Sequence, residues 1–383
     1  MVQDISELEE IKEESNITVE DSEKEENDVV QVTESTTDKM EPVHLDKKPE
    51  VVRVLIGRDK YKHDIYWEFG NKALANRHLL ITGTSGQGKT YSIQTMLYEL
   101  ARCDISSVIF DYTEGFMLQQ LEPPFKESLD GKIVQKIVYS TGVPINPFKR
   151  HEVDLAGMKI LEKESDVAAR LSDIFSHVYD FGAQQNAAIF EAAYNGLVKY
   201  GDNMNIRKFQ QELEEVAEIN KAANTVISKM TPFFRTVDFT EDPEFDWENI
   251  LYNDEGKVNI IQLTLFSREM QVIITEMMLW DAWYYTKKFG SKDKPFVVVL
   301  DEAQNLSHTI KSPSAAILTE GRKFGWSAWF ATQSLKILKD DEVVRLLQAS
   351  FKLYFKPTDD EMTKISKQID VCLLYTSPSP RDT

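Results

Sequence analysis

Eight consecutive residues constrain the fold of this chain more than any other feature. They match the pattern G-x-x-x-x-G-K-[ST] without a mismatch: Gly83, Thr84, Ser85, Gly86, Gln87, Gly88, Lys89 and Thr90. Residues 77–82 before them predict a short buried strand, and residues 91–102 after them carry apolar side chains at helical spacing. A strand, a glycine-rich turn and a helix in this order curl successive backbone N–H groups around an anion. The segment therefore predicts a phosphate-binding loop.

The polar residues at the end of this loop indicate which phosphate ligand it takes. The start of a helix adds partial positive charge to the inward-facing N–H groups. Lys89 is expected to reach the β- and γ-phosphates, and Thr90 to place its hydroxyl on Mg²⁺. We therefore expect all eight residues to bind a nucleotide together with Mg²⁺.

Both ends of the chain differ from the patterned sequence between them. Residues 1–50 hold 17 acidic and 5 basic side chains, a balance of −12 within a net charge of −19. This segment is poor in large apolar residues and cannot bury enough surface to offset chain entropy, so we expect a disordered acidic tail. Residues 371–383 show no periodic pattern, and we expect them to be a non-native tail.

Composition also bears on the compartment and on the partners. The acidic total argues against a protein that coats nucleic acid over its outer surface, but it permits nucleic acid inside a channel. Cys103 and Cys372 lie far apart without C-x-x-C spacing, which indicates a reducing compartment and neither a disulfide framework nor a zinc site. No apolar run approaches the roughly 20 residues that span a bilayer. We expect a cytoplasmic protein without membrane contact.

Strand and helix patterns alternate outside these ends. The strand patterns cover 51–57, 65–70, 106–112, 132–134, 137–139, 257–263, 296–302, 327–333 and 351–355, and the helix patterns cover 269–289, 312–324 and 341–349. Such alternation is typical of an α/β fold with a mostly parallel sheet and helices on both of its faces.

A block of helical periodicity, from about 152 to 237, interrupts this alternation. It predicts about four helices inserted between strands of the sheet. We accordingly divide the chain into the first part of the core at 51–150, a helical insertion at 151–240 and the second part of the core at 241–370.

Two adjacent carboxylates end the most apolar strand pattern. Residues 297–300 are followed by Asp301 and Glu302. An enzyme with a phosphate-binding loop holds Mg²⁺ with a carboxylate at the end of a neighbouring strand, and Asp301 fits that role. Glu302 stands where a general base would orient an attacking water. The pair favours hydrolysis over phosphoryl transfer to another substrate.

Three further polar residues extend this prediction. Gln333 ends the next strand pattern, where a neutral amide can touch a γ-phosphate. Arg322 lies between the two strands, and its guanidinium could reach a neighbouring subunit's phosphate or belong to an ordinary surface charge pair. Asp111, at the end of the strand pattern at 106–112, is a candidate neighbour of the catalytic water.

Taken in order, these motifs resemble the HerA/FtsK superfamily of P-loop ATPases, and its HerA branch most closely. The matching segments are Gly83–Thr90, Phe110–Asp111, Asn146–Pro147, Leu300–Ala303, Gly321–Gly325 and Ala331–Ser334. The resemblance covers roughly 51–370. Two departures stand out, since there is no room before the core for a small β-barrel and the C-terminal bracing segment looks cut off.

The resemblance implies a RecA-like core, a ring of six subunits, ATP hydrolysed between subunits and double-stranded DNA in the pore. Arg322 would then act on the neighbour's ATP, and Gln333 would sense its γ-phosphate. A nuclease partner in DNA processing or defence is implied as well. Lys336, Lys339 and Arg345 are candidates for a loop that faces the pore.

Two alternatives to a DNA-translocating motor remain open on the sequence. A conjugative coupling or type IV secretion ATPase shares the same core motifs. A P-loop protein that uses ATP as an assembly switch, without moving on DNA, would also carry them.

Overall fold

A computed structural model describes residues 52–155, 157–240, 242, 245–356, 362 and 365. All of them belong to one compact unit that spans residues 48–383. The tails predicted at 1–50 and 371–383 lie outside the described residues.

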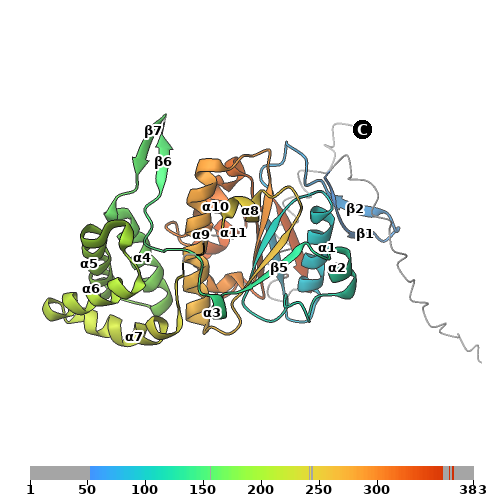
Figure 1. Cartoon of the computed structure of the whole chain (residues 1–383). Helices are drawn as coiled ribbons and strands as arrows, with labels where there is room; N and C mark the ends of the chain where they lie inside the picture. The colour runs from blue at the N-terminus through green and yellow to red at the C-terminus, as the bar shows by residue number, and fades with distance from the viewer. Residues whose placement is uncertain are drawn as a thin grey trace, which may run out of the picture. The chain divides into compact units, whose positions relative to one another are not determined.

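Seven parallel strands form the central sheet of this unit (Figure 1). In spatial order they are β11 (Phe351–Phe355), β3 (Leu79–Gly83), β10 (Trp326–Thr332), β9 (Phe296–Leu300), β4 (Ser107–Asp111), β8 (Val258–Gln262) and β5 (Ile133–Ile137). Every neighbouring pair in this order is parallel. The predicted α/β fold with a parallel sheet is confirmed.

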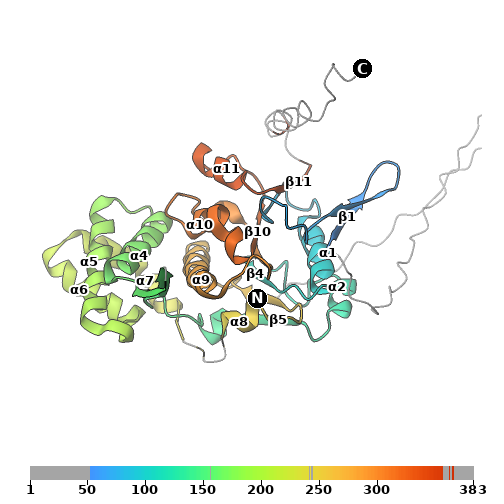
Figure 2. The same ribbon diagram turned by 90° about the horizontal axis from the view of Figure 1, so that it is seen from above.

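The sheet is buried on both faces because its strands are apolar at successive positions, which a parallel sheet between helices requires. Leu79 and Ile81 of β3 point to one core cluster and Leu80 to the other. The first cluster is covered by α1 (Lys89–Ala101), α2 (Pro123–Ser128) and the antiparallel pair β1 (Val54–Arg58) and β2 (Asp64–Trp67). The second is covered by α9 (Arg268–Phe289) and α10 (Pro313–Glu320), as the view from above shows (Figure 2).

Four long helices lie between β5 and β8 in the chain and pack against one another. They are α4 (Glu164–Tyr179), α5 (Ala183–Tyr200), α6 (Ile206–Ile219) and α7 (Ala222–Thr236), with a short 3₁₀ turn at Gly201–Asn203. The helical prediction for 152–161 was wrong. That segment is an antiparallel hairpin of β6 (Glu152–Leu155) and β7 (Met158–Leu161), whose alternating polar and apolar residues give a strand period.

Three smaller differences separate the predicted elements from the observed ones. The strand predicted at 137–139 ends at Ile137, and α3 (Val138–Thr141) follows it. The helix predicted at 312–324 ends at Glu320 and continues as a 3₁₀ turn, Gly321–Phe324. The sequence patterns also missed α8 (Trp247–Leu251), whereas α11 (Asp340–Leu346) agrees with its prediction to within three residues.

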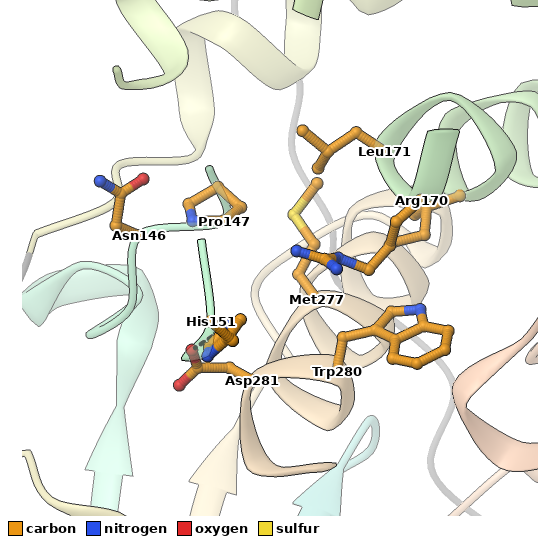
Figure 3. Close-up of a pocket in the computed structure, with 9 residues that line it drawn as sticks. Asn146, Pro147, His151, Arg170, Leu171, Met277, Trp280 and Asp281 are labelled. Atoms are coloured by element: carbon orange, nitrogen blue, oxygen red, sulfur yellow. Dashed lines mark ion pairs between the residues drawn. The ribbon is translucent and has the colours of Figure 1, made fainter. Parts of the chain in front are cut away.

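The hairpin and α4 are fastened to α9 by a polar cluster (Figure 3). His151 lies 3.4 Å from the carboxylate of Asp281 and stacks on Tyr284 at 4.6 Å between ring centroids. Burial lowers the pKa of His151 to about 3, so its ring is neutral near pH 7. Arg170 of α4 pairs with the buried Glu162 at the end of the hairpin. These contacts fix the insertion to the helix that covers the sheet.

Glu276 is a buried carboxyl group in the middle of α9. Its side chain is 2% exposed and accepts a hydrogen bond of 2.7 Å from the backbone N–H of Ser307. Desolvation raises its pKa to about 8, with the Ser307 bond opposing the shift. The folded chain therefore holds Glu276 protonated at pH values where the unfolded chain ionises it.

We predict that Glu276→Gln changes how stability depends on pH. Folding of the wild type raises the pKa of Glu276 from 4.5 to about 8, so the wild type loses stability as the pH rises between these values. The glutamine variant lacks this titration. As the pH rises through that window, the free energy of unfolding of the variant should increase relative to that of the wild type by up to about 1.4 kcal/mol per pH unit.

Urea unfolding at pH 5 and pH 8 measures this difference. The exposed Glu127→Gln in α2 serves as the matched control. A constant offset between Glu276→Gln and the wild type at both pH values would contradict the prediction.

Candidate nucleotide site

The predicted phosphate-binding loop lies between β3 and α1, where the buried strand ends and the helix begins. Gly86 and Gly88 adopt positive φ angles of 75° and 92°, which glycine reaches without strain, and a Cβ at either would meet nothing within 4 Å. The Lys89 ammonium lies 2.6 Å from the carbonyl oxygen of Gly83 and 3.1 Å from that of Thr84. The loop thus closes around its own lysine.

Gly83 is required by a close approach of two strands. A Cβ at this position would lie 2.2 Å from the carbonyl oxygen of Phe355 in β11. No side chain fits there without moving β11 away from β3. The first glycine of the motif therefore allows β11 to pair closely with β3.

The loop fits a phosphate group. Within the described residues, no N–H of 84–88 donates to another backbone carbonyl, although Lys89 begins the helix directly afterwards. N–H groups that have no partner within the chain can donate to a bound anion, and a phosphate accepts from several of them at once. Burial lowers the pKa of Lys89, while the charges of Asp301 and Glu302 oppose the shift. A nucleotide phosphate suits both the N–H groups and the lysine.

Asp301 and Glu302 follow β9 at the same edge of the sheet. Desolvation raises the pKa of Asp301 to about 7, and the charges of Glu302 and Asp111 add to the shift. A divalent cation would favour the ionised form of a carboxyl in this setting, which is the chemistry expected of a Mg²⁺ ligand. Glu302 has φ 50° and ψ 39°, a left-handed conformation that non-glycine residues rarely adopt. Such backbone strain is frequent at functional sites.

Two glutamines hold the carboxylate of Glu302. The Gln333 amide, just beyond β10, donates to Glu302 Oε1 at 2.7 Å. The Gln304 amide donates to Glu302 Oε2. Strand β10 lies between β3 and β9, so it brings Gln333 to the carboxylate that follows β9. The sequence patterns indicated Gln333 but missed Gln304, because the left-handed turn at Glu302 that brings Gln304 to the carboxylate has no signal in the sequence.

Asp111 shapes a loop that touches Thr90. It is fully buried and accepts hydrogen bonds from Thr113 N, Thr113 Oγ1 and Phe116 N, at 3.1, 3.2 and 3.0 Å. Burial raises its pKa to about 6, against the lowering effect of these bonds. At Gly115 a Cβ would stand 3.9 Å from the Thr90 hydroxyl oxygen. The loop at 113–116 therefore lies against the predicted Mg²⁺ ligand.

Arg322 is not part of this cluster. It lies in the 3₁₀ turn before β10, at the amino edge of the sheet. Burial lowers the pKa of Arg77, just ahead of β3, and the nearby charge of Arg322 adds to this shift. Gln333 follows the other end of β10. Seven residues at about 3.3 Å each separate the two ends by roughly 20 Å. Among the described residues Arg322 forms no ion pair, and it cannot reach the loop of its own chain.

The three basic residues after Gln333 differ in their surroundings. Lys336 and Lys339 are exposed. The guanidinium of Arg345 donates to the carbonyl of His308 and to the carboxylate of Asp341, at 2.8 Å each. Arg345 is thus engaged within the chain and is a weaker candidate for contact with a ligand.

The site and fold define a class of protein. A parallel sheet in which β10 separates the strand of the phosphate-binding loop from the strand that ends in Asp301 is the RecA-like arrangement of P-loop ATPases. The family model described as "Helicase HerA, central domain" matches residues 56–281. The chain belongs to this HerA family.

One relative and one solved structure are similar to this chain. The DNA double-strand break repair helicase HerA of Sulfurisphaera tokodaii is 24% identical over 315 residues, which cover 75% of this chain and 59% of that protein. The chain thus spans less than two thirds of this relative. The structure of VirB4 of Thermoanaerobacter pseudethanolicus has a TM-score of 0.61 at 15% identity and covers 83% of this chain and 87% of that one. This similarity shows a shared fold.

A further solved structure is the plasmid coupling protein TrwB in complex with ADP and Mg²⁺. It aligns with a TM-score of 0.48 at 17% identity, over 72% of this chain and 68% of that one.

In the described part of the present chain, no helix has the length and apolar character needed to cross a bilayer.

Proposed function

We propose that the protein is an ATP-hydrolysing motor that moves double-stranded DNA through a ring of six subunits. The observation that carries this proposal is the meeting of Lys89, the turn at Asp301 and Glu302, and Gln333 at one edge of the sheet. The HerA family membership of residues 56–281 supports the DNA part of the proposal.

Each residue of the loop has a separate task in this mechanism. The N–H groups of 84–88 and the Lys89 ammonium hold the β- and γ-phosphates of ATP. The Thr90 hydroxyl and Asp301 would hold Mg²⁺, which would supply positive charge beside the phosphates.

Glu302 acts as the general base that orients the attacking water, since its carboxylate accepts hydrogen bonds and is held in place by two amides. Gln333 donates to the same carboxylate, so it can exchange that bond for one to a γ-phosphate. Through this exchange Gln333 would report whether the γ-phosphate is present. Gln333 would then link the position of Glu302 to the presence of the γ-phosphate.

Arg322 acts on the ATP of a neighbouring subunit. Its place at the amino edge leaves its own loop out of reach, and a guanidinium supplied in trans stabilises charge on a transferring phosphoryl group. This requirement makes the ring part of the active site. Double-stranded DNA in the pore, a nuclease partner in DNA processing or defence, and a cytoplasmic location complete the proposal. The name of the HerA relative, a DNA double-strand break repair helicase, supports the DNA part.

We predict that the protein hydrolyses ATP and that double-stranded DNA stimulates the rate. Lys89→Ala should lower turnover by about 100-fold, because it removes a charge that the transition state needs. Glu302→Gln should lower turnover by a factor of about 100 or more, because an amide cannot accept the proton of water. Phosphate release with and without linear duplex DNA measures both effects.

The exposed Lys126→Ala and Glu127→Gln, both in α2, are matched controls. An ATPase rate that does not change on addition of DNA would contradict the motor and favour the alternative, in which ATP serves as an assembly switch. Displacement of a triplex-forming strand from duplex DNA separates the motor from a coupling or secretion ATPase, which needs no movement along linear duplex DNA.

The trans role of Arg322 predicts complementation between two inactive variants. A subunit with Arg322→Ala keeps its P-loop, and a subunit with Lys89→Ala keeps its arginine. Random mixing in equal amounts should restore about a quarter of the wild-type rate, because that share of interfaces pairs an intact loop with an intact arginine.

The measurement is ATPase activity after co-assembly, compared with each variant alone. A mixture no more active than the separate variants would show that the two residues do not meet across an interface.

A further inference from the structure

One buried histidine connects the Glu302 turn to α11. The ring of His308 is fully buried, and its Nε2 lies 2.8 Å from the carbonyl oxygen of Ala303, the residue after Glu302. A carbonyl oxygen only accepts, so Nε2 carries the proton and donates to it. Nδ1 lies 2.8 Å from the hydroxyl of Ser314 in α10. The ring thus bridges the turn and a neighbouring helix.

The backbone of the same residue is held by α11, which packs beside α10 (Figure 2). The N–H of His308 donates to Glu342 Oε1 at 3.2 Å, and the Arg345 guanidinium donates to the His308 carbonyl at 2.8 Å. The second oxygen of Glu342 accepts from the N–H of Lys339 at 3.1 Å and closes the first turn of α11. Burial lowers the pKa of His308 to about 4, so the connection is made by a neutral ring near pH 7.

These contacts attach the segment 334–339 to the Glu302 turn at both of its ends. At the start of the segment, Gln333 donates directly to the Glu302 carboxylate at 2.7 Å. At its end, Lys339 is bonded to Glu342, which holds His308, which holds Ala303. Between these ends Lys336 is exposed, and the side chain of Ile337 is 68% exposed. A displacement of this segment would therefore act on Glu302 through Gln333 at one end and through Glu342 and His308 at the other.

We propose that His308 is a positioning residue for Glu302 and couples contacts made by the segment 334–339 to the rate of hydrolysis. The proposal rests on the proposed function, in which Glu302 is the base and DNA passes through the ring. Its physical basis is the strained conformation of Glu302, since a left-handed turn persists only when its surroundings hold it. The bond from His308 to Ala303 is one such constraint.

Two substitutions of similar size separate positioning from packing. In His308→Gln the amide nitrogen can take the place of Nε2 and still donate to Ala303. In His308→Asn the shorter amide reaches the Ser314 hydroxyl but not Ala303. Asp340→Asn, an exposed position at the start of α11, removes a charge near the segment without touching His308.

The experiment measures kcat and KM for ATP without DNA, and then the stimulation by linear duplex DNA. Without DNA, His308→Asn should lower kcat about tenfold with KM unchanged, because a single positioning hydrogen bond is lost. His308→Gln should recover most of that loss. Stimulation by DNA should fall in His308→Asn and stay at the wild-type value in His308→Gln and Asp340→Asn.

Three results would overturn the inference. The first is wild-type kinetics in His308→Asn, and the second is an equal loss in the Asn and Gln variants, which indicates packing alone. The third is a full response to DNA in His308→Asn. If DNA does not stimulate the wild type, the proposed motor is overturned instead. The difference in kcat between His308→Asn and His308→Gln without DNA still tests the positioning role.

Circular dichroism and thermal melting show whether His308→Asn folds. If it does not fold, Glu342→Gln is tested in its place. The single oxygen of the glutamine amide can accept from only one of the two N–H groups, those of His308 and Lys339, that the Glu342 carboxylate holds. The contacts of the His308 ring stay in place. Glu342→Gln should reduce stimulation by DNA at least about threefold. Stimulation equal to that of Asp340→Asn would then overturn the coupling.

Discussion

Parallel pairing of β3, β10 and β9 is the constraint on which the rest of the site depends. Each strand is buried along its whole length, so the sheet cannot slip by one residue without turning apolar side chains toward the wrong core. The pairing brings three chain segments that are far apart in sequence to a single edge. The phosphate-binding loop, the Asp301 turn and Gln333 then lie within reach of one another.

Much of this arrangement was predictable from local pattern. The loop motif and the four apolar residues before Asp301 indicated both halves of the site, because strands of a parallel sheet end at the same edge. Periodicity also predicted the four long helices α4 to α7. It failed at 152–161, where a strand period of only a few residues adjoined a long helical block, and at Val138, where a short apolar run fits either a helix or a strand.

What sequence could not give was the set of partners across the fold. The bond from Gln304 to Glu302 depends on a left-handed turn, which no residue type signals when the residue is a glutamate. The contacts of His308 with Ala303, Ser314 and Glu342 join three elements, and their adjacency depends on how α10 and α11 pack. Asp111, predicted to lie near the catalytic water, also holds the 113–116 loop and adds to the charge near Asp301, and only the structure shows these two roles.

The same geometry divides the proposed reaction between two subunits. One edge of the sheet gathers the groups that hold phosphate, metal and water, and Arg322 stands at the other edge. A single chain would then carry a binding site that lacks one of its catalytic charges. In this account the ring does more than enclose DNA, since it also completes each site.

The most direct test of this claim is the ATPase rate per chain, measured as a function of protein concentration alongside sedimentation of the same samples. If each site is completed by a neighbour, the rate per chain should rise as rings assemble and then reach a plateau. A constant rate per chain at concentrations where the protein sediments as a monomer would contradict the account.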